Sequence, residues 1–249
     1  MRIAVAGATG RLGRQVSEVL TERGHEVVAM SRATGVDIIT GAGLDAALAG
    51  AEVIVDTATC PSPEQQPATD FFLTAAHNLQ KAGVQAGVRR AVVVSIINVD
   101  KSANGYSLAK IAHEDAWRSG PIPVRLIRAA QFHEFVAQLL EWGTQGDVAY
   151  VPEMRTQIVA ARTVAEAIAD AVTTEDGDPD QITEIAGPRE EDLAELARLL
   201  VARHGTPVTV QAVRNPADPD ADLQATGGLL PGPGARLAGP TFEQWLGTI

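Results

Sequence analysis

The chain holds a single cysteine, Cys60, among its 249 residues. One thiol forms no disulfide within the chain, which is typical of a protein in a reducing compartment. Basic residues are also scarce, since 20 Lys and Arg stand against 31 Asp and Glu, for a formal net charge of −11. Nucleic-acid binding needs cationic side chains that neutralise phosphates in bulk, so this balance argues against a nucleic-acid partner.

Long apolar runs are absent as well, and no signal peptide is expected. No apolar run reaches the length of a membrane span, and the first predicted strand begins at the second or third residue, which leaves no room for a signal peptide. We therefore expect a cytoplasmic protein without a membrane partner. We also expect no metal site, because the histidines lie too far apart in sequence to suggest a ligand cluster. They are His25, His77, His113, His133 and His204.

The chain does contain a glycine-rich stretch near its start, Gly7-Ala8-Thr9-Gly10-Arg11-Leu12-Gly13. An apolar run at residues 3–6 precedes it and suits a strand buried on both faces, and apolar residues at helical spacing follow it. A turn without side chains lets a pyrophosphate approach the positively polarised helix N-terminus, so this pattern predicts a dinucleotide site. The spacing is GxxGxxG, not the GxGxxG of the standard fingerprint, and the alternative is a flexible surface turn. The predicted cofactor contacts here are Gly7, Thr9, Gly10, Arg11, Leu12 and Gly13.

The end of the second predicted strand, residues 25–30, bears on which nucleotide is bound. NAD-specific folds place an acidic residue there to hold the ribose 2′-hydroxyl. This chain has Ser31 and Arg32 instead, and Arg11 is available from the glycine stretch. Two guanidinium groups beside a 2′-phosphate favour NADP(H) over NAD(H), although both arginines could be ordinary surface residues. Asp37, in the next loop, is a candidate for the adenine end of the cofactor.

Strands and helices alternate through the first half of the chain. Strands are predicted over 52–56, 91–94 and 123–127, and helices over 44–48, 67–86 and 106–117. This is the pattern of an α/β fold with a doubly wound parallel sheet of the Rossmann type, which we assign to residues 1–130. Residues 131–249 are expected to form a small α/β substrate lobe integrated with it. Ligands bind at the carboxyl ends of such strands, which makes Thr57, Ala58, Thr59 and Ser95 candidate cofactor contacts.

A second informative stretch, Tyr106-Ser107-Leu108-Ala109-Lys110, has the spacing Tyr-x-x-x-Lys. Residues four apart share one helix face, so the phenol and the ammonium are expected to point the same way. A nearby cation favours phenolate and lowers the tyrosine pKa toward the working pH. We predict Tyr106 as the catalytic acid and Lys110 as the residue that tunes it and binds the nicotinamide ribose. The alternative is a tyrosine that only packs.

Ser95 is the third catalytic candidate, because it follows the fourth strand and could hydrogen-bond the substrate oxygen whose charge changes during hydride transfer. The apolar pair Ile96-Ile97 comes next, which leaves open that Ser95 faces the core. Asn98 or backbone groups would then orient the substrate.

The stretch from residue 131 onward is expected to form a lid over the nicotinamide, with Gln131 and Phe132 in contact with the cofactor. Phe132, Phe135 and Trp142 belong to an apolar helical set that lines either a pocket or the core. His133 is a candidate proton donor, with a structural histidine as the alternative. The substrate candidates are Asn98, Phe132, His133 and Trp142.

The remaining sequence gives local expectations. Thr163-Val164-Ala165-Glu166 has the spacing of a capping box and predicts a helix start. A helix is predicted over 190–203 with Leu199 among its core-facing residues. The acidic run at 175–178 predicts a solvated turn, and the loops at 215–219 and 227–234 are expected near the pocket mouth.

These stretches resemble the atypical short-chain dehydrogenase/reductase superfamily, within its NmrA-like, NAD(P)H-binding group. The resemblance is carried by the glycine stretch, Ser95, residues 106–114, residues 128–135 and residues 239–246. It implies that Gly7, Gly10 and Gly13 bind pyrophosphate and that Arg32 binds the 2′-phosphate. It also implies a catalytic triad of Ser95, Tyr106 and Lys110. Some relatives have lost the tyrosine and act as NADP(H)-responsive regulators, whereas this chain keeps both Tyr and Lys, which favours an enzyme.

The sequence thus predicts an NADPH-dependent oxidoreductase that transfers hydride to a small carbonyl, quinone or activated alkene. Two alternatives stay open: a non-enzymatic NADP(H) sensor of the NmrA type, and a nicotinamide-dependent isomerase or epimerase. The expected partner is a small-molecule substrate, and a homo-oligomer is left open.

Overall fold

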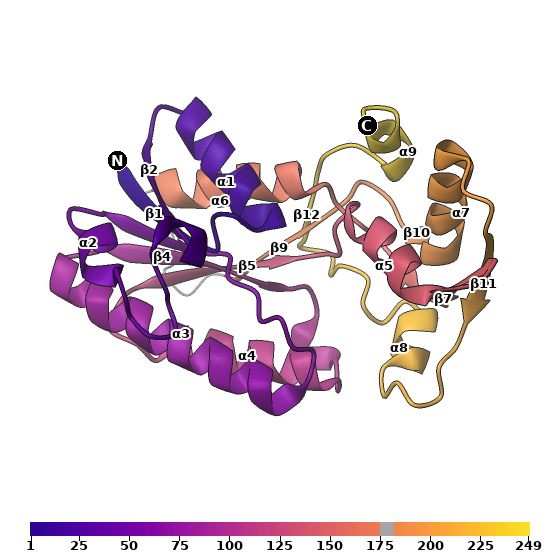
Figure 1. Cartoon of the computed structure of the whole chain (residues 1–249), viewed down its shortest axis with the longest axis horizontal. Coiled ribbons are helices and arrows are strands. Elements are labelled where there is room, and N and C mark those ends of the chain that lie inside the picture. Colours follow the sequence, from indigo (N-terminus) through magenta and orange to yellow (C-terminus); the bar gives the residue numbers. More distant parts are fainter. Residues whose placement is uncertain (175–181) are drawn as a thin grey trace.

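A computed structural model describes residues 1–174 and 182–249 of the chain (Figure 1). The acidic run at 175–178, for which a solvated turn is predicted, lies outside the described residues. No helix in the described part is long and apolar enough to cross a membrane.

The centre of the molecule is a seven-stranded sheet in which every neighbouring pair of strands is parallel. Its order is β12-β9-β5-β4-β3-β1-β2. The strands are β1 (Arg2–Ala6), β2 (Glu26–Met30), β3 (Val53–Asp56), β4 (Arg90–Ile96), β5 (Val124–Ala129), β9 (Ile182–Ala186) and β12 (Arg236–Leu237). The chain leaves β1 to one side for β2 and to the other for β3, so the strand order reverses at β1. Ligands of open parallel sheets bind at such a reversal, beyond the carboxyl ends of the strands.

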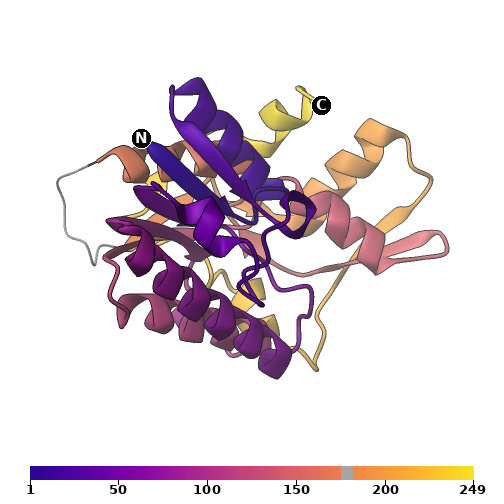
Figure 2. The same cartoon turned by 60° about the vertical axis from the view of Figure 1, so that its left-hand side comes forward.

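Helices cover both faces of this sheet, as predicted for a doubly wound α/β fold (Figures 1 and 2). One face carries α1 (Arg11–Glu22) and α6 (Ala161–Thr173), and the other carries α2 (Leu44–Leu48), α3 (Gln65–Ala86) and α4 (Gly105–Arg118). The apolar strands feed a separate core on each side: Ile3 and Val5 face α1 and α6, while Ala4 and Ile54 face α2 and α3. Strands buried on both faces are therefore apolar at successive positions.

A smaller lobe lies beyond the carboxyl ends of the strands (Figure 1). It contains a three-stranded sheet in the order β11-β7-β6, a two-stranded sheet of β10 and β8, and a core of its own. Its elements are α5 (Phe135–Gly143), β6 (Thr144–Gln145), β7 (Val148–Pro152), β8 (Arg155–Thr156), β10 (Glu191–Asp192), α7 (Leu193–His204), β11 (Thr209–Val213), α8 (Ala221–Ala225) and α9 (Phe242–Leu246).

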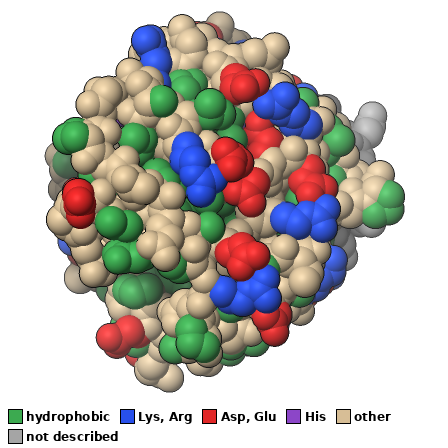
Figure 3. All heavy atoms as spheres, turned by 90° about the vertical axis from the view of Figure 1, so that its right-hand side faces the viewer, with side chains coloured by type: hydrophobic (Ala, Val, Ile, Leu, Met, Phe, Trp, Pro, Cys, Tyr) green, Lys and Arg blue, Asp and Glu red, His purple; other side chains and the backbone are tan. Residues whose placement is uncertain are grey.

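The lobe is smaller than the predicted range of 131–249. Helix α6 packs against α1, and strands β9 and β12 extend the large sheet, so the second half of the chain returns twice to the large domain. On the face of the lobe in Figure 3, arginine side chains lie next to acidic ones. Arg189, Arg198 and Arg214 of the lobe each form an ion pair with a glutamate.

Two local predictions in this half are wrong. Helix α6 begins at Ala161 instead of near Thr163, and no side chain caps it from its own N-cap residue. The carboxylate of Glu134 accepts a hydrogen bond from the Ala161 amide at 3.3 Å, so a distant residue replaces the capping box. Leu199 is 37% exposed, because α7 presents Leu193, Leu196 and Leu200 to the lobe core.

Candidate functional site

The glycine turn between β1 and α1 is built so closely that side chains do not fit. Gly7 has φ +76°, in the left-handed region that favours glycine. A Cβ on Gly13 would lie 2.2 Å from the Gly7 carbonyl oxygen and 2.7 Å from Thr57 Oγ1. Thr57 Oγ1 is itself fixed, since it donates to the Ala6 carbonyl at 2.7 Å.

This turn fits a dinucleotide. Gly10 is the N-cap of α1, and no side chain caps that end of the helix. Backbone N–H groups at such an end, together with the helix dipole, bind phosphate. The structure thus places Gly7, Gly10 and Gly13 at a crowded turn before an uncapped helix end, with Thr9, Arg11 and Leu12 between them, and their binding of a pyrophosphate stays a prediction.

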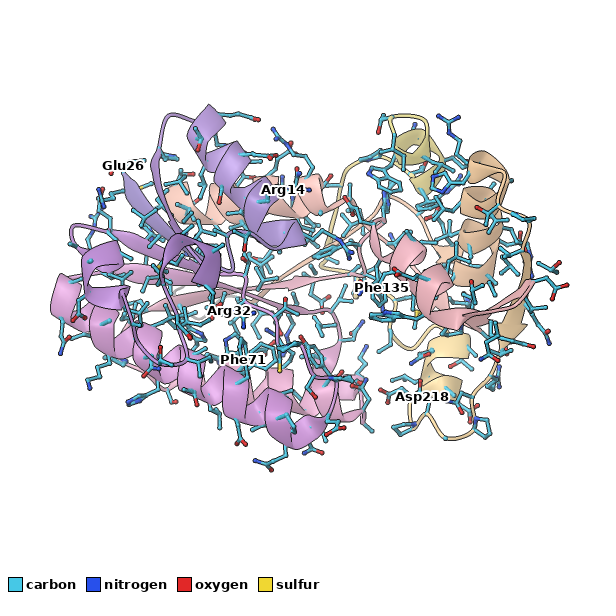
Figure 4. All side chains as sticks on the ribbon, viewed as in Figure 1. Arg14, Glu26, Arg32, Phe71, Phe135 and Asp218 are labelled. Carbon is cyan, nitrogen blue, oxygen red and sulfur yellow. The ribbon has the colours of Figure 1, made fainter. Side chains whose placement is uncertain are left out.

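The end of β2 adjoins this turn, because the Gly7 and Ala8 amides donate to the Met30 carbonyl at 3.0 and 3.4 Å. Ser31 caps the short 3-10 helix η1 (Arg32–Thr34), and Arg32 stands exposed at its start (Figure 4). Arg11 instead donates to Gln138 of α5 at 3.3 Å and so contacts the lobe. The two predicted guanidinium groups thus have different surroundings, and Arg32 is the one at the end of β2.

Asp37 and two of the three residues after β3 make contacts within the protein. Asp37 Oδ1 accepts from the Ile39 amide at 2.8 Å, so this carboxylate closes its own loop in the manner of an Asx turn. Thr57 packs against the glycine turn, the Ala58 amide donates to Asp56 Oδ1 at 3.0 Å, and Thr59 is exposed.

Tyr106 lies in the first turn of α4, beside the residues that follow β3. Its ring meets Phe72 edge-on with ring centroids 5.7 Å apart. Burial raises the pKa of the phenol to about 12 and the Cys60 thiol adds to the rise, while a backbone hydrogen bond with Cys60 opposes it. The phenol is therefore fully protonated at neutral pH.

Lys110 does not act on Tyr106 as predicted. Its ammonium donates to the Val94 carbonyl at 2.8 Å, lies 3.0 Å from His113 Nδ1, and sits over the Phe72 ring at 4.5 Å. Burial lowers the pKa of Lys110 to about 8, against the opposing effect of Asp56 and Glu114. In this arrangement Lys110 does not contribute to the pKa of Tyr106, because the ammonium binds acceptors in the interior.

Behind Lys110 lies a buried polar cluster that the sequence analysis missed. His113 Nε2 lies 3.0 Å from Asp56 Oδ2, and Trp117 Nε1 donates to the same oxygen at 3.1 Å. Since His113 Nδ1 faces an ammonium, Nε2 carries the proton and donates to Asp56. A signal existed: Lys110, His113 and Trp117 recur at helical spacing on one face of α4, and that face is buried.

Ser95 and Asn98, the two candidates for orienting the substrate oxygen, differ in whether their polar groups are free. Ser95 alternates with Ala91 and Val93, which face α3 and α4, so it lies on the same side of the sheet as Tyr106. Its buried hydroxyl has no hydrogen-bond partner in the structure. Asn98, at φ +50°, donates its side-chain amide to the Leu230 carbonyl at 2.7 Å. Ser95 is therefore the candidate with an unused polar group.

His133 is structural. It is fully buried, lies 3.2 Å from the Ile158 carbonyl through Nε2, and packs against Phe242 and Trp245. Burial lowers its pKa to about 4, although the bond to Ile158 opposes this, so the ring is neutral at physiological pH. These contacts favour the structural histidine over the proton donor, because the ring lies inside the lobe core.

The other lid residues are spread over several surroundings. Gln131 accepts from Thr156 at 2.9 Å, and Phe132 pairs with Val159 and packs on the core beside α1. Trp142 remains 64% exposed and meets Phe135 edge-on at 5.8 Å. Phe135 projects from the lobe near the large domain, across from Arg32 and Phe71 (Figure 4).

No family model matches the chain, and no curated protein matches it. Solved structures do resemble it. A short-chain dehydrogenase/reductase superfamily protein from Agrobacterium tumefaciens with bound NAD has a TM-score of 0.67 at 17% identity, over 100% of this chain and 95% of that one. The chain shares the doubly wound, Rossmann-type α/β fold of that protein.

Two further structures share this fold. The NADPH-dependent quinone oxidoreductase QOR2 from Escherichia coli is 20% identical over 99% of this chain and 98% of its own, with a TM-score of 0.68. UDP-N-acetylglucosamine 4-epimerase from Bacillus cereus is 16% identical over 99% and 94%, with a TM-score of 0.71. The doubly wound, Rossmann-type α/β fold predicted from the sequence is therefore confirmed.

Proposed function

We propose that this chain is an NADPH-dependent reductase that transfers hydride to a small carbonyl, quinone or activated alkene. The observation that carries the proposal is the glycine turn, whose contacts exclude side chains at an uncapped helix end. The same edge of the sheet holds Ser95 and the first turn of α4, where Tyr106 lies. Two structural neighbours support it, an NADPH-dependent quinone oxidoreductase and a short-chain dehydrogenase/reductase superfamily protein with bound NAD.

Each residue has a defined part in this proposal. Gly7, Gly10 and Gly13 receive the pyrophosphate, and Arg32 binds the 2′-phosphate, which gives the preference for NADPH. A nicotinamide held there would supply the hydride. Tyr106, protonated at neutral pH, gives a proton to the substrate oxygen, and the free hydroxyl of Ser95 binds that oxygen.

Lys110 takes the ribose-binding role only if its ammonium exchanges the bond to His113 for one to the nucleotide. That exchange would also bring its charge closer to Tyr106 and lower the phenol pKa toward the working range. The proposal therefore includes a rearrangement of this one side chain on binding.

The test is a kinetic assay of NADPH oxidation with a panel of quinones and aromatic ketones. We expect turnover with at least one acceptor, and about 100-fold slower turnover in Tyr106→Phe. Tyr150→Phe, at the partly exposed tyrosine on β7, is the matched control and should leave turnover unchanged. Full activity in Tyr106→Phe would remove the phenol from the mechanism.

A second candidate is a nucleotide sensor without turnover. Two observations favour it. Burial raises the pKa of Tyr106, and the Lys110 ammonium contacts His113 in the interior, so the lysine does not activate the phenol. A sensor would bind NADPH and NADP⁺ with clearly different affinities and consume neither. An epimerase, like the Bacillus cereus neighbour, would convert a nucleotide sugar with no net change in nicotinamide.

A further inference from the structure

A segment of the lobe around α8 binds the loop between β4 and α4 at two points. Asn98 makes the first, by donating to the Leu230 carbonyl at 2.7 Å. Asp220, at the start of α8, makes the second with residues 102–104, more than a hundred positions earlier in the chain. Asp218, two residues before it, marks this part of the lobe in Figure 4.

The buried carboxylate of Asp220 accepts hydrogen bonds at both of its oxygens. Only 1% of the residue is exposed. One oxygen accepts from the Ala103 amide at 2.7 Å, and the other accepts from the Ser102 hydroxyl and from the backbone and side-chain N–H groups of Asn104 at 3.2 and 2.7 Å. Burial raises the pKa of Asp220, but these donors outweigh it and hold the pKa below its ordinary value. A buried charge is stable only when it is satisfied in this way.

Asn104 connects this carboxylate to the candidate proton donor. Its side-chain oxygen accepts from the Ser107 amide at 2.9 Å, which makes Asn104 the N-cap of α4. Tyr106 lies in the turn that this cap fixes. Close packing also restricts this end of α4, since a Cβ on Gly105 would lie 2.8 Å from Gln65 of α3.

We propose that Asp220 is a positioning residue for Tyr106, acting through Asn104, so that the place of the phenol depends on the attachment of the lobe. A substrate that displaces the α8 segment would then move the proton donor. The inference rests on the proposed function for the role of Tyr106, and it names the residue through which the lobe acts on that role.

The experiment measures the surroundings and the pKa of the phenol at position 106 directly. Tyr106 and Tyr150 are the only tyrosines, so a Tyr150→Phe protein labelled with 3-fluorotyrosine gives one fluorine resonance from position 106. In Asp220→Asn we expect this resonance to shift and the phenol pKa to fall by about one unit, because a looser first turn admits water. Asp222→Asn is the matched control: this carboxylate is on the same short helix, its side chain is 89% exposed, and it pairs with Arg214.

A rescue separates positioning from general damage. In the double variant Asn104→Asp with Asp220→Asn, the residue at 104 still caps α4, while the residue at 220 can donate to it in the reverse direction. This pair should move the resonance and the pKa back toward those of the parent protein. If Asp220→Asn does not fold, as shown by a lost thermal transition, Asn104→Ser takes its place, because serine keeps the cap and lacks the amide that binds Asp220.

The proposal is overturned if the folded variant leaves the resonance and the pKa of position 106 unchanged, if Asp222→Asn moves them equally, or if the double variant restores neither. The measurement needs neither nucleotide nor turnover. Failure of the proposed function would appear as absent NADPH oxidation and would leave this result intact.

Discussion

The two sides of the candidate site are held by different kinds of contact. On the nucleotide side, Gly7 and Gly13 touch backbone and the Thr57 side chain so closely that an added methyl group has no room. On the lobe side, buried polar groups make the connections: Asp220 binds residues 102–104, and Asn98 binds Leu230. The glycine contacts can be recognised from a short sequence motif, whereas buried polar pairs join positions far apart in the chain.

This difference has a chemical consequence. A turn packed on backbone offers a ligand one fixed geometry, which suits a pyrophosphate common to many reactions. Side-chain hydrogen bonds can be exchanged, which suits the half of the site that differs between substrates. Substitutions on each side measure how far the two sides differ.

The largest effect is expected at Gly13. Gly13→Ala places a Cβ 2.2 Å from a backbone oxygen, so α1 must shift, and we expect a loss of about 4 kcal/mol in unfolding free energy together with loss of NADPH binding. Urea unfolding and a nucleotide titration measure both. Gly234→Ala is the control, because its Cβ meets no atom within 4 Å. Equal stability of the two variants would contradict the close packing of the turn.

Lys110 should make the unfolding free energy depend on pH in the alkaline range. Its pKa is about 8 in the folded protein against 10.5 ordinarily, so the unfolded chain binds more protons between these values and stability rises with pH across them. The rise is about 3 kcal/mol. The difference in unfolding free energy between the parent and Lys110→Met, followed from pH 8 upward, measures it. A constant difference would show that the ammonium is not buried.

His133 should give a similar slope on the acid side. Its pKa falls from 6.5 to about 4 on folding, so the unfolded chain binds more protons in that window and stability is lost as pH drops through it, by about 3 kcal/mol. His133→Gln keeps a donor for Ile158 and removes the titration, which should flatten acid denaturation. His204→Gln, at an exposed histidine in α7, is the matched control. An unchanged acid limb in His133→Gln would contradict the lowered pKa of the buried ring.

The smallest effect concerns nucleotide choice. Arg32→Ala should weaken NADPH binding about tenfold and leave NADH binding unchanged, because only NADPH carries the 2′-phosphate. Arg11→Ala should have less effect on this preference, since that guanidinium binds Gln138. Equal weakening of both nucleotides by Arg32→Ala would assign this arginine a role other than 2′-phosphate binding.

The sequence predicts the doubly wound fold, the position of α4 and the glycine turn, because strand burial and helix periodicity are local properties. It does not predict where Lys110 points. That depends on His113 and on Asp56, which is 57 positions away from His113. The cap of α6 was missed for the same reason, since Glu134 lies 27 positions before the amide that it binds. His133 could not be distinguished from a catalytic histidine without the aromatic side chains of α9 around it.

The most direct test of the account is a calorimetric titration of the purified protein with NADPH and with NADH, run in parallel with Gly13→Ala. The account predicts measurable heat and protection against melting with NADPH, weaker binding of NADH, and no binding to the variant. Absence of both heat and protection with either nucleotide would contradict it.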